Sequence, residues 1–367
     1  MSKHLKKTHG GLNYSRLKEK GITPEDIIDF SVSINPFPVH ESIINAVRNC
    51  SLTRYPDSSA YELRERIAQY ENCRVDEVLA VNGTSQGINL IGEAFLDSNS
   101  TVLIAAPAYS QYKNISQLKK SKIIELESDV SRDFKPDENQ IIEKIEEIRP
   151  EIFWICNPNN PTGTYLAEDK MDKIEEAAKK TGTIVVIDEA YIAFTKKELR
   201  FRKESTNILR LNSMTKDYGI PGLRLGYIHG DQELLKTIAD HQPEWSISAP
   251  AQKAGIACLD ENEYYAKTWA SVKEECERFR NKLIGIGLKV YETESNFFMV
   301  RLGSRADIED GSPGYASLLQ HALESKNIQI RDCSSFGYPD HIRIGIHSRE
   351  NNELLFQAIK EETSIWE

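Results

Sequence analysis

The chain has 367 residues, a formal net charge of -10 at pH 7, and 40% hydrophobic residues. This length can bury a large core and predicts two domains, and the acidic balance argues against a general nucleic-acid-binding protein. The six cysteines include no Cys-x-x-Cys pair, so we expect reduced thiols and no metal site. The opening segment 1–7 is not followed by an apolar core, and no apolar run reaches membrane-spanning length, which predicts a cytoplasmic protein.

Short apolar runs that are typical of buried strands alternate with helical stretches along the chain. This alternation predicts an α/β fold with a largely parallel sheet flanked by helices. Open sheets of this kind bind ligands at the carboxyl ends of their strands, so the residues that follow each run are the candidates for function. The expected strands are 77–81, 101–106, 152–156, 184–187 and 208–211.

Lys216 follows the last of these runs and is accompanied by Ser213, Thr215 and Arg224. A lysine that forms a Schiff base must lose its proton, and a partly buried, cation-rich pocket favours that loss. This setting suits a Schiff base to an anionic aldehyde cofactor. Judged alone, Lys216 would be taken for an ordinary surface lysine, and the neighbouring motifs are what favour the Schiff base.

Three further side chains follow expected strands. Asp188 ends the run at 184–187 and could pair with a protonated pyridine nitrogen or cap the next helix. Asn160 lies between two prolines, which would hold its amide rigidly. Tyr109 lies beyond the strand 101–106 and could stack on a heteroaromatic cofactor or belong to the rim of the core.

A glycine-containing turn at 82–87 joins the strand 77–81 to the helical pattern of Ile88, Ile91 and Phe95. Free backbone amides at a helix start, together with the positive end of the helix dipole, form a phosphate site. Such turns are common before helices, so the alternative is an ordinary turn that connects the strand to the helix and binds nothing.

Together these residues resemble the fold-type I pyridoxal-phosphate enzymes of the aspartate aminotransferase superfamily, and the resemblance covers nearly the whole chain. It rests on Asn-Asn-Pro-Thr-Gly at 159–163, Asp-Glu-Ala-Tyr at 188–191, and Ser-x-Thr-Lys at 213–216 with a downstream Gly-Leu-Arg-Leu-Gly. The resemblance implies a large domain with a mostly parallel seven-stranded sheet and a smaller C-terminal α+β domain. The expected divisions are an N-terminal arm near the active site at 1–34, the large cofactor domain at 35–243, and the small domain at 244–367.

The resemblance also implies the roles of the cofactor residues. Lys216 would hold pyridoxal 5'-phosphate as a Schiff base, and Asp188 would pair with the pyridinium nitrogen. Asn160 and Tyr191 would bond the ring hydroxyl while Tyr109 stacks on the ring, with Lys216, Asp188 and Tyr191 as the catalytic set. Tyr55 would reach the partner subunit's cofactor phosphate, which implies a homodimer with shared sites. The residues that would hold the phosphate within one chain are Gly83, Thr84, Ser85, Ser213, Thr215 and Arg224.

The two ends of the chain are similar to the threonine-phosphate decarboxylase branch of cobalamin biosynthesis, which is close to histidinol-phosphate aminotransferase. This similarity lies in Thr-His-Gly-Gly at 8–11, Asp-Phe-Ser-x-x-Ile-Asn-Pro at 29–36 and Ile-Arg-Asp-Cys at 330–333. It implies decarboxylation of L-threonine O-3-phosphate or L-serine O-phosphate. Arginine forks suit the carboxylate and phosphate of such substrates. The candidate substrate residues are His9, Ser33, Asn35, Asn160, Arg331 and Arg343; Arg343 matches the superfamily's carboxylate position, but which arginine takes which anion stays open.

Three functions are compatible with these motifs. The first is a phospho-amino-acid decarboxylase, and the second is an aminotransferase acting on histidinol phosphate or a related substrate. The third is a non-enzymatic regulator with the same fold, which usually carries an added DNA-binding domain for which we expect no room before Asp29.

Overall fold

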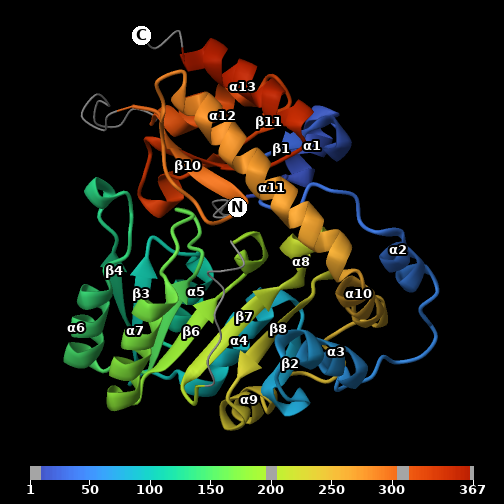
Figure 1. The fold of residues 1–367 in the computed structure, drawn as a ribbon, viewed down its shortest axis with the longest axis vertical. Coiled ribbons are helices and arrows are strands. Elements are labelled where there is room, and N and C mark those ends of the chain that lie inside the picture. Colours follow the sequence, from blue (N-terminus) through green and yellow to red (C-terminus); the bar gives the residue numbers. More distant parts are fainter. Residues whose placement is uncertain (1–9, 196–204, 304–313, 364–367) are drawn as a thin grey trace. The chain divides into compact units, whose positions relative to one another are not determined.

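The computed structural model describes residues 10–195, 205–303 and 314–363 (Figure 1). The chain divides into two compact units, which we describe separately. Unit 1 consists of residues 1–36, 161–163 and 271–367, and unit 2 consists of residues 37–160 and 164–270. None of the helices in the described ranges is long and apolar enough to cross a membrane.

Unit 2 contains a seven-stranded sheet with the order β2-β8-β7-β6-β5-β3-β4. Neighbouring strands are parallel except at β8, which is antiparallel to both β2 and β7. The mostly parallel seven-stranded sheet expected from the sequence is therefore confirmed. Its strands are β2 (Val78–Val81), β3 (Thr101–Ala106), β4 (Lys122–Glu127), β5 (Ile152–Cys156), β6 (Ile184–Asp188), β7 (Ile208–Ser213) and β8 (Gly226–Gly230).

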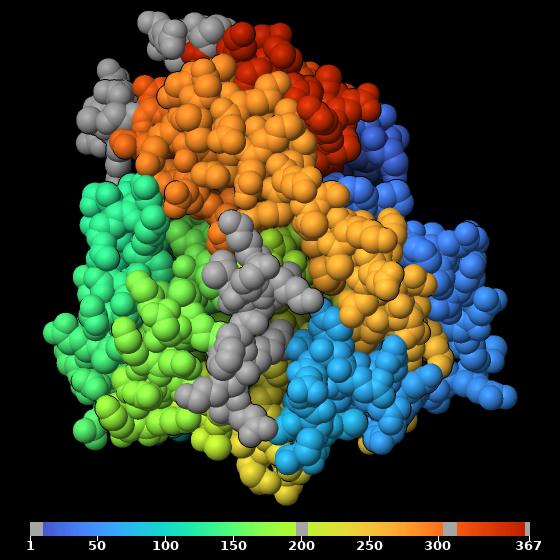
Figure 2. All heavy atoms as spheres, viewed as in Figure 1, coloured from blue at the N-terminus to red at the C-terminus, as the bar shows by residue number. Residues whose placement is uncertain are grey.

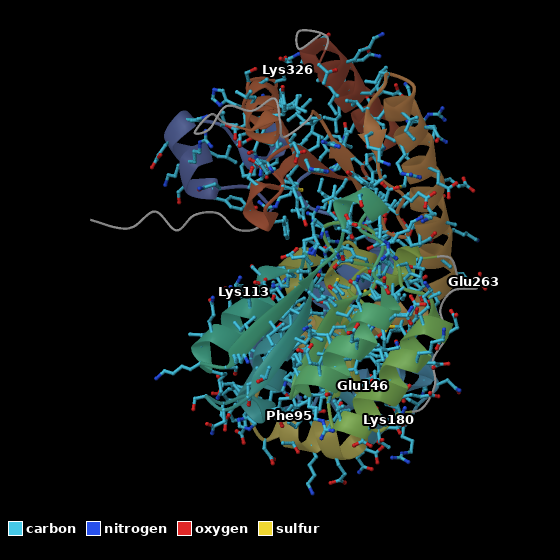
Figure 3. The ribbon with its side chains drawn as sticks, turned by 90° about the vertical axis from the view of Figure 1, so that its left-hand side faces the viewer. Phe95, Lys113, Glu146, Lys180, Glu263 and Lys326 are labelled. Carbon is cyan, nitrogen blue, oxygen red and sulfur yellow. The ribbon has the colours of Figure 1, made fainter. Side chains whose placement is uncertain are left out.

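Helices cover both faces of this sheet because successive strand residues point to opposite sides. Ile104 belongs to the core formed with α4, α5 and α9, whereas its neighbour Leu103 belongs to the core formed with α6 and α7. Lys113, Glu146 and Lys180, labelled in Figure 3, lie exposed on α5, α6 and α7. The helices of unit 2 are α2 (Glu41–Arg48), α3 (Tyr61–Glu71), α4 (Gly83–Phe95), α5 (Ser110–Leu118), α6 (Glu138–Ile148), α7 (Glu168–Thr181), α8 (Met214–Asp217), α9 (Gln232–Ala239) and α10 (Ala249–Asp260).

Unit 1 contains a four-stranded antiparallel sheet of order β12-β13-β10-β9 and a parallel pair of β1 with β11. The pair joins early and late parts of the chain, since Ile28 lies opposite Ile328. Helix α11 (Asn262–Ile284) contributes residues to both units. The other elements are α1 (Tyr14–Lys20), β1 (Ile28–Asp29), β9 (Lys289–Val290), β10 (Phe297–Arg301), α12 (Tyr315–Glu324), β11 (Ile328–Gln329), β12 (Arg331–Asp332), β13 (His341–Gly345) and α13 (Arg349–Thr363).

The compact units do not follow the divisions expected at 34/35 and 243/244. Helix α10 packs against α2 and α3, and a Cβ on Gly255 would lie 2.7 Å from Leu63 Cδ1, so the segment after 243 stays with unit 2 as far as Ala270. Among the described residues, 10–36 group with the C-terminal part, and β1 pairs with β11. These boundaries depend on long-range packing, which sequence periodicity does not report.

Candidate active site

The sequence motifs of unit 2 meet at the ends of β5, β6 and β7. Lys216 lies in the short helix α8 directly after β7, and its Nζ donates to Ser213 Oγ at 3.4 Å. The same amine lies 5.1 Å from the centroid of the Tyr191 ring. Burial lowers the pKa of Lys216, while the nearby Asp188 carboxylate acts in the opposite direction. A lysine in this setting releases its proton more readily than a surface lysine, which is what covalent attachment to an aldehyde requires.

Asp188 ends β6 and has only 4% of its surface exposed. Its Oδ1 accepts from the Ala190 backbone N–H at 3.0 Å, and its Oδ2 accepts from the Tyr112 hydroxyl at 2.7 Å. Burial raises the pKa of Asp188, and Lys216 and Tyr112 oppose that rise. A buried carboxylate of this kind is stabilised by an added cationic hydrogen-bond donor.

The expected phosphate site lies at the start of α4. Gly83 begins this helix with φ +70°, and a Cβ at that position would lie 2.6 Å from Arg224 Nη2. A Cβ on Gly226 would lie 3.2 Å from the Thr84 backbone nitrogen, so β8 and the helix start approach closely. Gly226 is also the register partner of Ser213 on β7. The first amides of α4, the Arg224 guanidinium and the Ser213 hydroxyl thus lie in one neighbourhood, as the sequence predicts.

Hydroxyl and aromatic groups extend this neighbourhood. The Thr215 and Ser213 hydroxyls lie 2.7 Å apart, and the Ser85 hydroxyl lies 3.4 Å from the Tyr109 hydroxyl. Tyr191 is buried three residues beyond Asp188, the last residue of β6. These contacts join the helix start to the aromatic side chain expected above the cofactor ring.

Asn160 is buried in the turn after β5, where its backbone N–H faces the Cys156 thiol. Cys156 is the register partner of Asp188 across β5 and β6. The turn that carries Asn160 is therefore held at the same sheet edge as the carboxylate.

Tyr55 lies on the surface, as does Arg224 among the other predicted cofactor residues. Its side chain is 81% exposed, and its ring centroid lies 4.9 Å from that of Trp245. The family resemblance predicts that Tyr55 contacts the cofactor phosphate of a second subunit.

Unit 1 brings the two candidate arginines side by side. Arg331 on β12 is the register partner of Arg343 on β13, and the two residues are 7% and 5% exposed. Burial lowers the pKa of Arg331, and the adjacent Arg343 cation lowers it further. Arg331 Nη2 donates to Ser335 Oγ at 2.6 Å, and Arg343 Nη2 donates to the Ser31 carbonyl at 2.7 Å. We call Arg331 and Arg343 the arginine pair; it concentrates positive charge in an acidic protein.

The N-terminal candidates lie on the segment that follows β1. Ser33 and Asn35 are each 4% exposed, and the Ser33 hydroxyl is buried without a hydrogen-bond partner among the described residues. Gly11 N–H donates to the Ser31 hydroxyl at 2.7 Å, so the start of the described chain lies beside the residue whose carbonyl holds Arg343. His9 lies outside the described residues.

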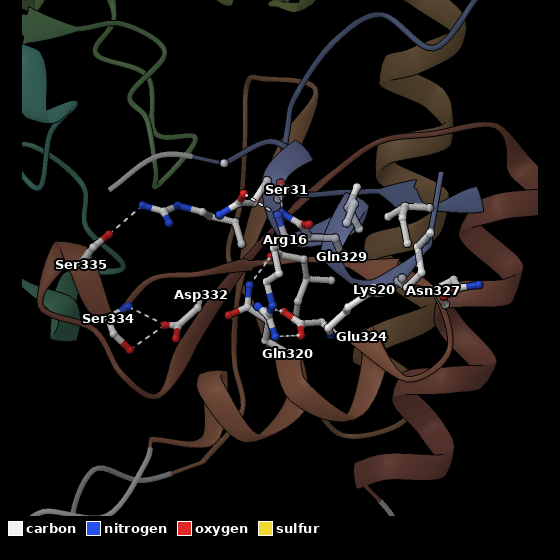
Figure 4. Close-up of a pocket in the computed structure, with 18 residues that line it drawn as sticks. Arg16, Lys20, Ser31, Gln320, Glu324, Asn327, Gln329, Asp332, Ser334 and Ser335 are labelled. Carbon is white, nitrogen blue, oxygen red and sulfur yellow. Dashed lines mark hydrogen bonds and ion pairs between the residues drawn. The ribbon is translucent and has the colours of Figure 1, made fainter. Parts of the chain in front are cut away.

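A cavity of about 690 Å³ in unit 1 adjoins one member of the arginine pair (Figure 4). Its lining includes Arg331, Ser31 and Ser335, and from α1 it includes Arg16 and Lys20. Arg16 is paired with Glu324 at 2.9 Å across the cavity wall. The lining also includes Glu324 and Asp332, so acidic as well as basic groups face the space beside Arg331.

Sequence reasoning missed two groups around Asp188. Tyr112, the second tyrosine of a Tyr-x-x-Tyr pattern that begins at Tyr109, donates to the carboxylate, and Cys156 lies on the adjacent strand. The spacing of the two tyrosines is the one signal in the sequence that could have drawn attention to Tyr112.

A family model described as "Aminotransferase class I and II" matches residues 25–359. A histidinol-phosphate aminotransferase from Geobacillus sp. (strain WCH70) is 28% identical over 349 residues, which are 93% of this chain and 91% of that protein. A protein from Caldanaerobacter subterraneus subsp. tengcongensis, provisionally named a threonine-phosphate decarboxylase, is 30% identical over 336 residues, or 89% of this chain and 88% of that protein.

Solved structures of similarly named enzymes also resemble this chain. The L-threonine-O-3-phosphate decarboxylase from Porphyromonas gingivalis has a TM-score of 0.73 and 25% identity, covering 89% of this chain and 94% of that chain. A histidinol-phosphate aminotransferase from Sinorhizobium meliloti, solved with pyridoxal-5'-phosphate, has the same fold, with a TM-score of 0.86, 17% identity, and coverage of 100% of this chain and 99% of that chain.

Proposed function

The chain belongs to the class I and II aminotransferase family, and from this premise we propose that it decarboxylates an O-phosphorylated amino acid. The candidate substrates are L-threonine O-3-phosphate and L-serine O-phosphate. The corresponding products are aminopropanol phosphate, a precursor of the linker in the cobalamin nucleotide loop, and ethanolamine phosphate.

Pyridoxal phosphate is the cofactor of the chain. The residues of unit 2 fit this group, because a glycine-start helix with an adjacent Arg224 suits its phosphate and buried Asp188 suits its ring nitrogen. When bound, the protonated ring of the cofactor acts as an electron sink for the carbanion formed at the substrate α-carbon.

The chain's own groups have separate tasks in the proposed reaction. With the cofactor bound, Asp188 would keep its ring nitrogen protonated, and Asn160 and Tyr191 would hold its hydroxyl. Lys216 Nζ would hold the cofactor, and its amine would supply the proton that replaces the carboxylate on the α-carbon. The bond that breaks joins the α-carbon to the carboxylate, and carbon dioxide leaves.

The arginine pair is the observation that carries the substrate proposal. A substrate with a carboxylate and a phosphate brings about three negative charges, and two adjacent buried guanidiniums suit two such anions. We assign Arg343 to the carboxylate, after the family position, and Arg331 to the phosphate with Ser33, Asn35 and His9. By holding the two anionic groups of the substrate, these residues would orient the bond that the cofactor's electron-sink chemistry breaks.

The alternative is an aminotransferase acting on histidinol phosphate, and the names of several relatives favour it. Such an enzyme needs the same cofactor residues and also binds two anions, although on two successive substrates. The cofactor residues of unit 2 therefore do not distinguish the two functions, and the reaction products must be measured.

Parallel assays separate these functions. Carbon dioxide release is measured with the phosphorylated and unphosphorylated forms of threonine and serine, and glutamate formation is measured with histidinol phosphate and 2-oxoglutarate. We expect carbon dioxide from both phosphorylated amino acids, because one methyl group changes binding by only ~1 to 3 kcal/mol in an apolar pocket. Glutamate formation without carbon dioxide release would establish the alternative.

We also propose that the chain forms a homodimer. Large apolar side chains are exposed around α2 and α3, which lie at the surface of the molecule (Figure 2). Exposed apolar side chains of this size are candidates for burial in a subunit interface. The exposed residues, with Tyr55 and Trp245 in ring contact, are Ile44, Leu52, Tyr55, Tyr61 and Trp245.

A further inference from the structure

Tyr112 is a fully buried tyrosine whose hydroxyl is directed at the carboxylate proposed to control the cofactor. Its O–H donates to Asp188 Oδ2 at 2.7 Å. Its ring stacks on Trp154 with a centroid distance of 5.1 Å and an interplanar angle of 7°, and the Tyr109 ring meets its edge at 5.9 Å. Packing on two sides thus fixes the direction of the phenol.

We propose that Tyr112 is a positioning residue that keeps Asp188 ionised and aimed at the ring nitrogen of pyridoxal phosphate. The proposal rests on the cofactor and does not depend on which substrate the enzyme accepts. Tyr112 would act through Asp188 and need not touch the cofactor or the substrate.

The two oxygens of Asp188 are held by different groups. Oδ1 accepts from Ala190 N–H and Oδ2 accepts from Tyr112 O–H, which fixes the plane of the carboxylate. Each carboxylate oxygen can accept more than one hydrogen bond, so these contacts leave acceptor capacity for a pyridinium N–H.

The surrounding charges explain why the phenol matters. Burial favours the neutral form of Asp188, and the adjacent Glu189 carboxylate adds to that tendency. The Lys216 amine, the Ala190 N–H and the Tyr112 hydroxyl oppose it, and the Cys156 thiol faces the same space. Once Lys216 is bonded to the cofactor, Tyr112 is a neutral donor that continues to favour the carboxylate.

Tyr112 itself stays protonated. Burial and the Asp188 charge raise the pKa of Tyr112 well above its ordinary value, so the phenol remains a donor wherever the protein is folded. It can therefore stabilise the Asp188 charge without competing for the proton on the ring nitrogen.

The test uses holoenzyme loaded with pyridoxal phosphate labelled with nitrogen-15 in its ring, in the absence of substrate. The nitrogen-15 chemical shift reports ring protonation and is followed against pH in the wild type and in Tyr112→Phe, which keeps the stacked ring. We expect the ring nitrogen of Tyr112→Phe to lose its proton at lower pH than in the wild type. With any accepted substrate, turnover should fall roughly 10- to 100-fold at nearly unchanged KM, since a hydrogen bond to a charged group is lost.

Two comparisons separate this role from a structural one. Tyr265→Phe removes another buried hydroxyl, one that accepts from His40 N–H, and should leave the nitrogen-15 titration unchanged. In an Asp188→Asn background, Tyr112→Phe should produce little further change, because its effect passes through the carboxylate. An unshifted titration in folded Tyr112→Phe, or an equal shift in both backgrounds, would overturn the proposal. Absence of decarboxylase activity would leave this test intact and refute only the proposed reaction.

Discussion

Burial moves the pKa values of Asp188 and Lys216 toward each other, upward for the acid and downward for the base. Neither shift is a gain for the folded protein by itself, because burial disfavours the charged form of each group. Both shifts suit a cofactor that supplies a cation to the acid and an aldehyde to the base. The pKa shifts of Asp188 and Lys216 are therefore the ones expected of residues that bind this cofactor.

The first prediction concerns covalent attachment at Lys216. Since its pKa is lowered, the neutral amine should be abundant at lower pH than for a free lysine, whose pKa is about 10.4. Attachment of pyridoxal phosphate to the cofactor-free protein should speed up as pH rises and level off once pH exceeds the lowered pKa. Borohydride reduction followed by peptide mass spectrometry measures the attached fraction and its position.

Lys216→Ala is the control for this experiment and should show no reduced adduct while still binding some cofactor noncovalently. An adduct on a different lysine, or a pH midpoint at that of free lysine, would contradict the assignment.

The residues that the sequence proposes for the strand-end site lie close together because each one follows a buried strand of the same sheet. Lys216, Asp188 and Ser213 are examples, and their neighbourhood follows from the sheet order once the strands are right. Tyr112 was missed because its function depends on how α5 is rotated over the sheet. That rotation is set by packing on Trp154, which local sequence does not reveal.

At the scale of elements, the start of α4 combines a left-handed glycine with a close approach of Arg224. The glycine pattern predicted a phosphate site here, but the helix begins at Gly83, before the periodic apolar residues from Ile88 onward. Glycine is needed at position 83 for two reasons. Its φ is +70°, and a Cβ there would collide with the Arg224 guanidinium.

The second prediction compares Gly83→Ala with Gly182→Ala. Both glycines have positive φ, but a Cβ at Gly182 meets nothing within 4 Å. Each change should lower the free energy of unfolding of the cofactor-free protein by about 1 to 2 kcal/mol through backbone strain. Gly83→Ala alone should also displace Arg224 and weaken cofactor binding roughly 10- to 100-fold.

Equilibrium binding of pyridoxal phosphate and denaturant unfolding measure the two effects separately. Equal cofactor affinity in the two variants would show that the α4 start does not hold the phosphate.

The third prediction concerns the arginine pair on β12 and β13. Arg331→Ala and Arg343→Ala should each reduce kcat/KM on a phosphorylated amino acid about 30-fold to several thousand-fold, because each removes a charge-assisted contact worth roughly 2 to 5 kcal/mol. The absorption spectrum of the bound cofactor should stay unchanged. Arg301→Ala, on neighbouring β10 and partly exposed, is the matched control and should keep wild-type efficiency.

Steady-state kinetics on phosphorylated and unphosphorylated threonine locate the anions. If Arg331 binds the phosphate, Arg331→Ala should lower kcat/KM only for phosphorylated threonine. Arg343→Ala should lower kcat/KM for both the phosphorylated and the unphosphorylated form. If both variants lost kcat/KM in the same way on the two forms of threonine, the assignment of the phosphate to Arg331 and of the carboxylate to Arg343 would be refuted.

For the whole molecule, sequence periodicity predicted the sheet and its flanking helices but not the extent of the compact units. The β1–β11 pair joins residues about 300 positions apart, and α10 remains with α2 and α3, so both divisions depend on contacts between distant segments. The resemblance at the chain ends predicts that Arg331 and Arg343 both bind substrate, and the structure shows that the two residues are register partners on adjacent strands.

The fourth prediction tests shared active sites in the proposed homodimer. Tyr55→Ala and Lys216→Ala should each be impaired, but mixing and reassociating the two variants should restore activity. A hybrid dimer has one site with both native residues, so random pairing should recover about a quarter of wild-type sites. Activity that never exceeds the average of the two variants would contradict a site completed by the partner's Tyr55.

The proposed reaction is tested most directly by following the substrate carboxyl carbon. L-threonine O-3-phosphate labelled with carbon-13 at that carbon is incubated with the holoenzyme, without any keto acid, in deuterated water. We predict that the label leaves as carbon dioxide and that aminopropanol phosphate accumulates in equal amount with one deuteron at its new carbon–hydrogen bond. Retention of the label in a keto acid, or turnover only after 2-oxoglutarate is added, would contradict decarboxylation and assign the chain to amino-group transfer.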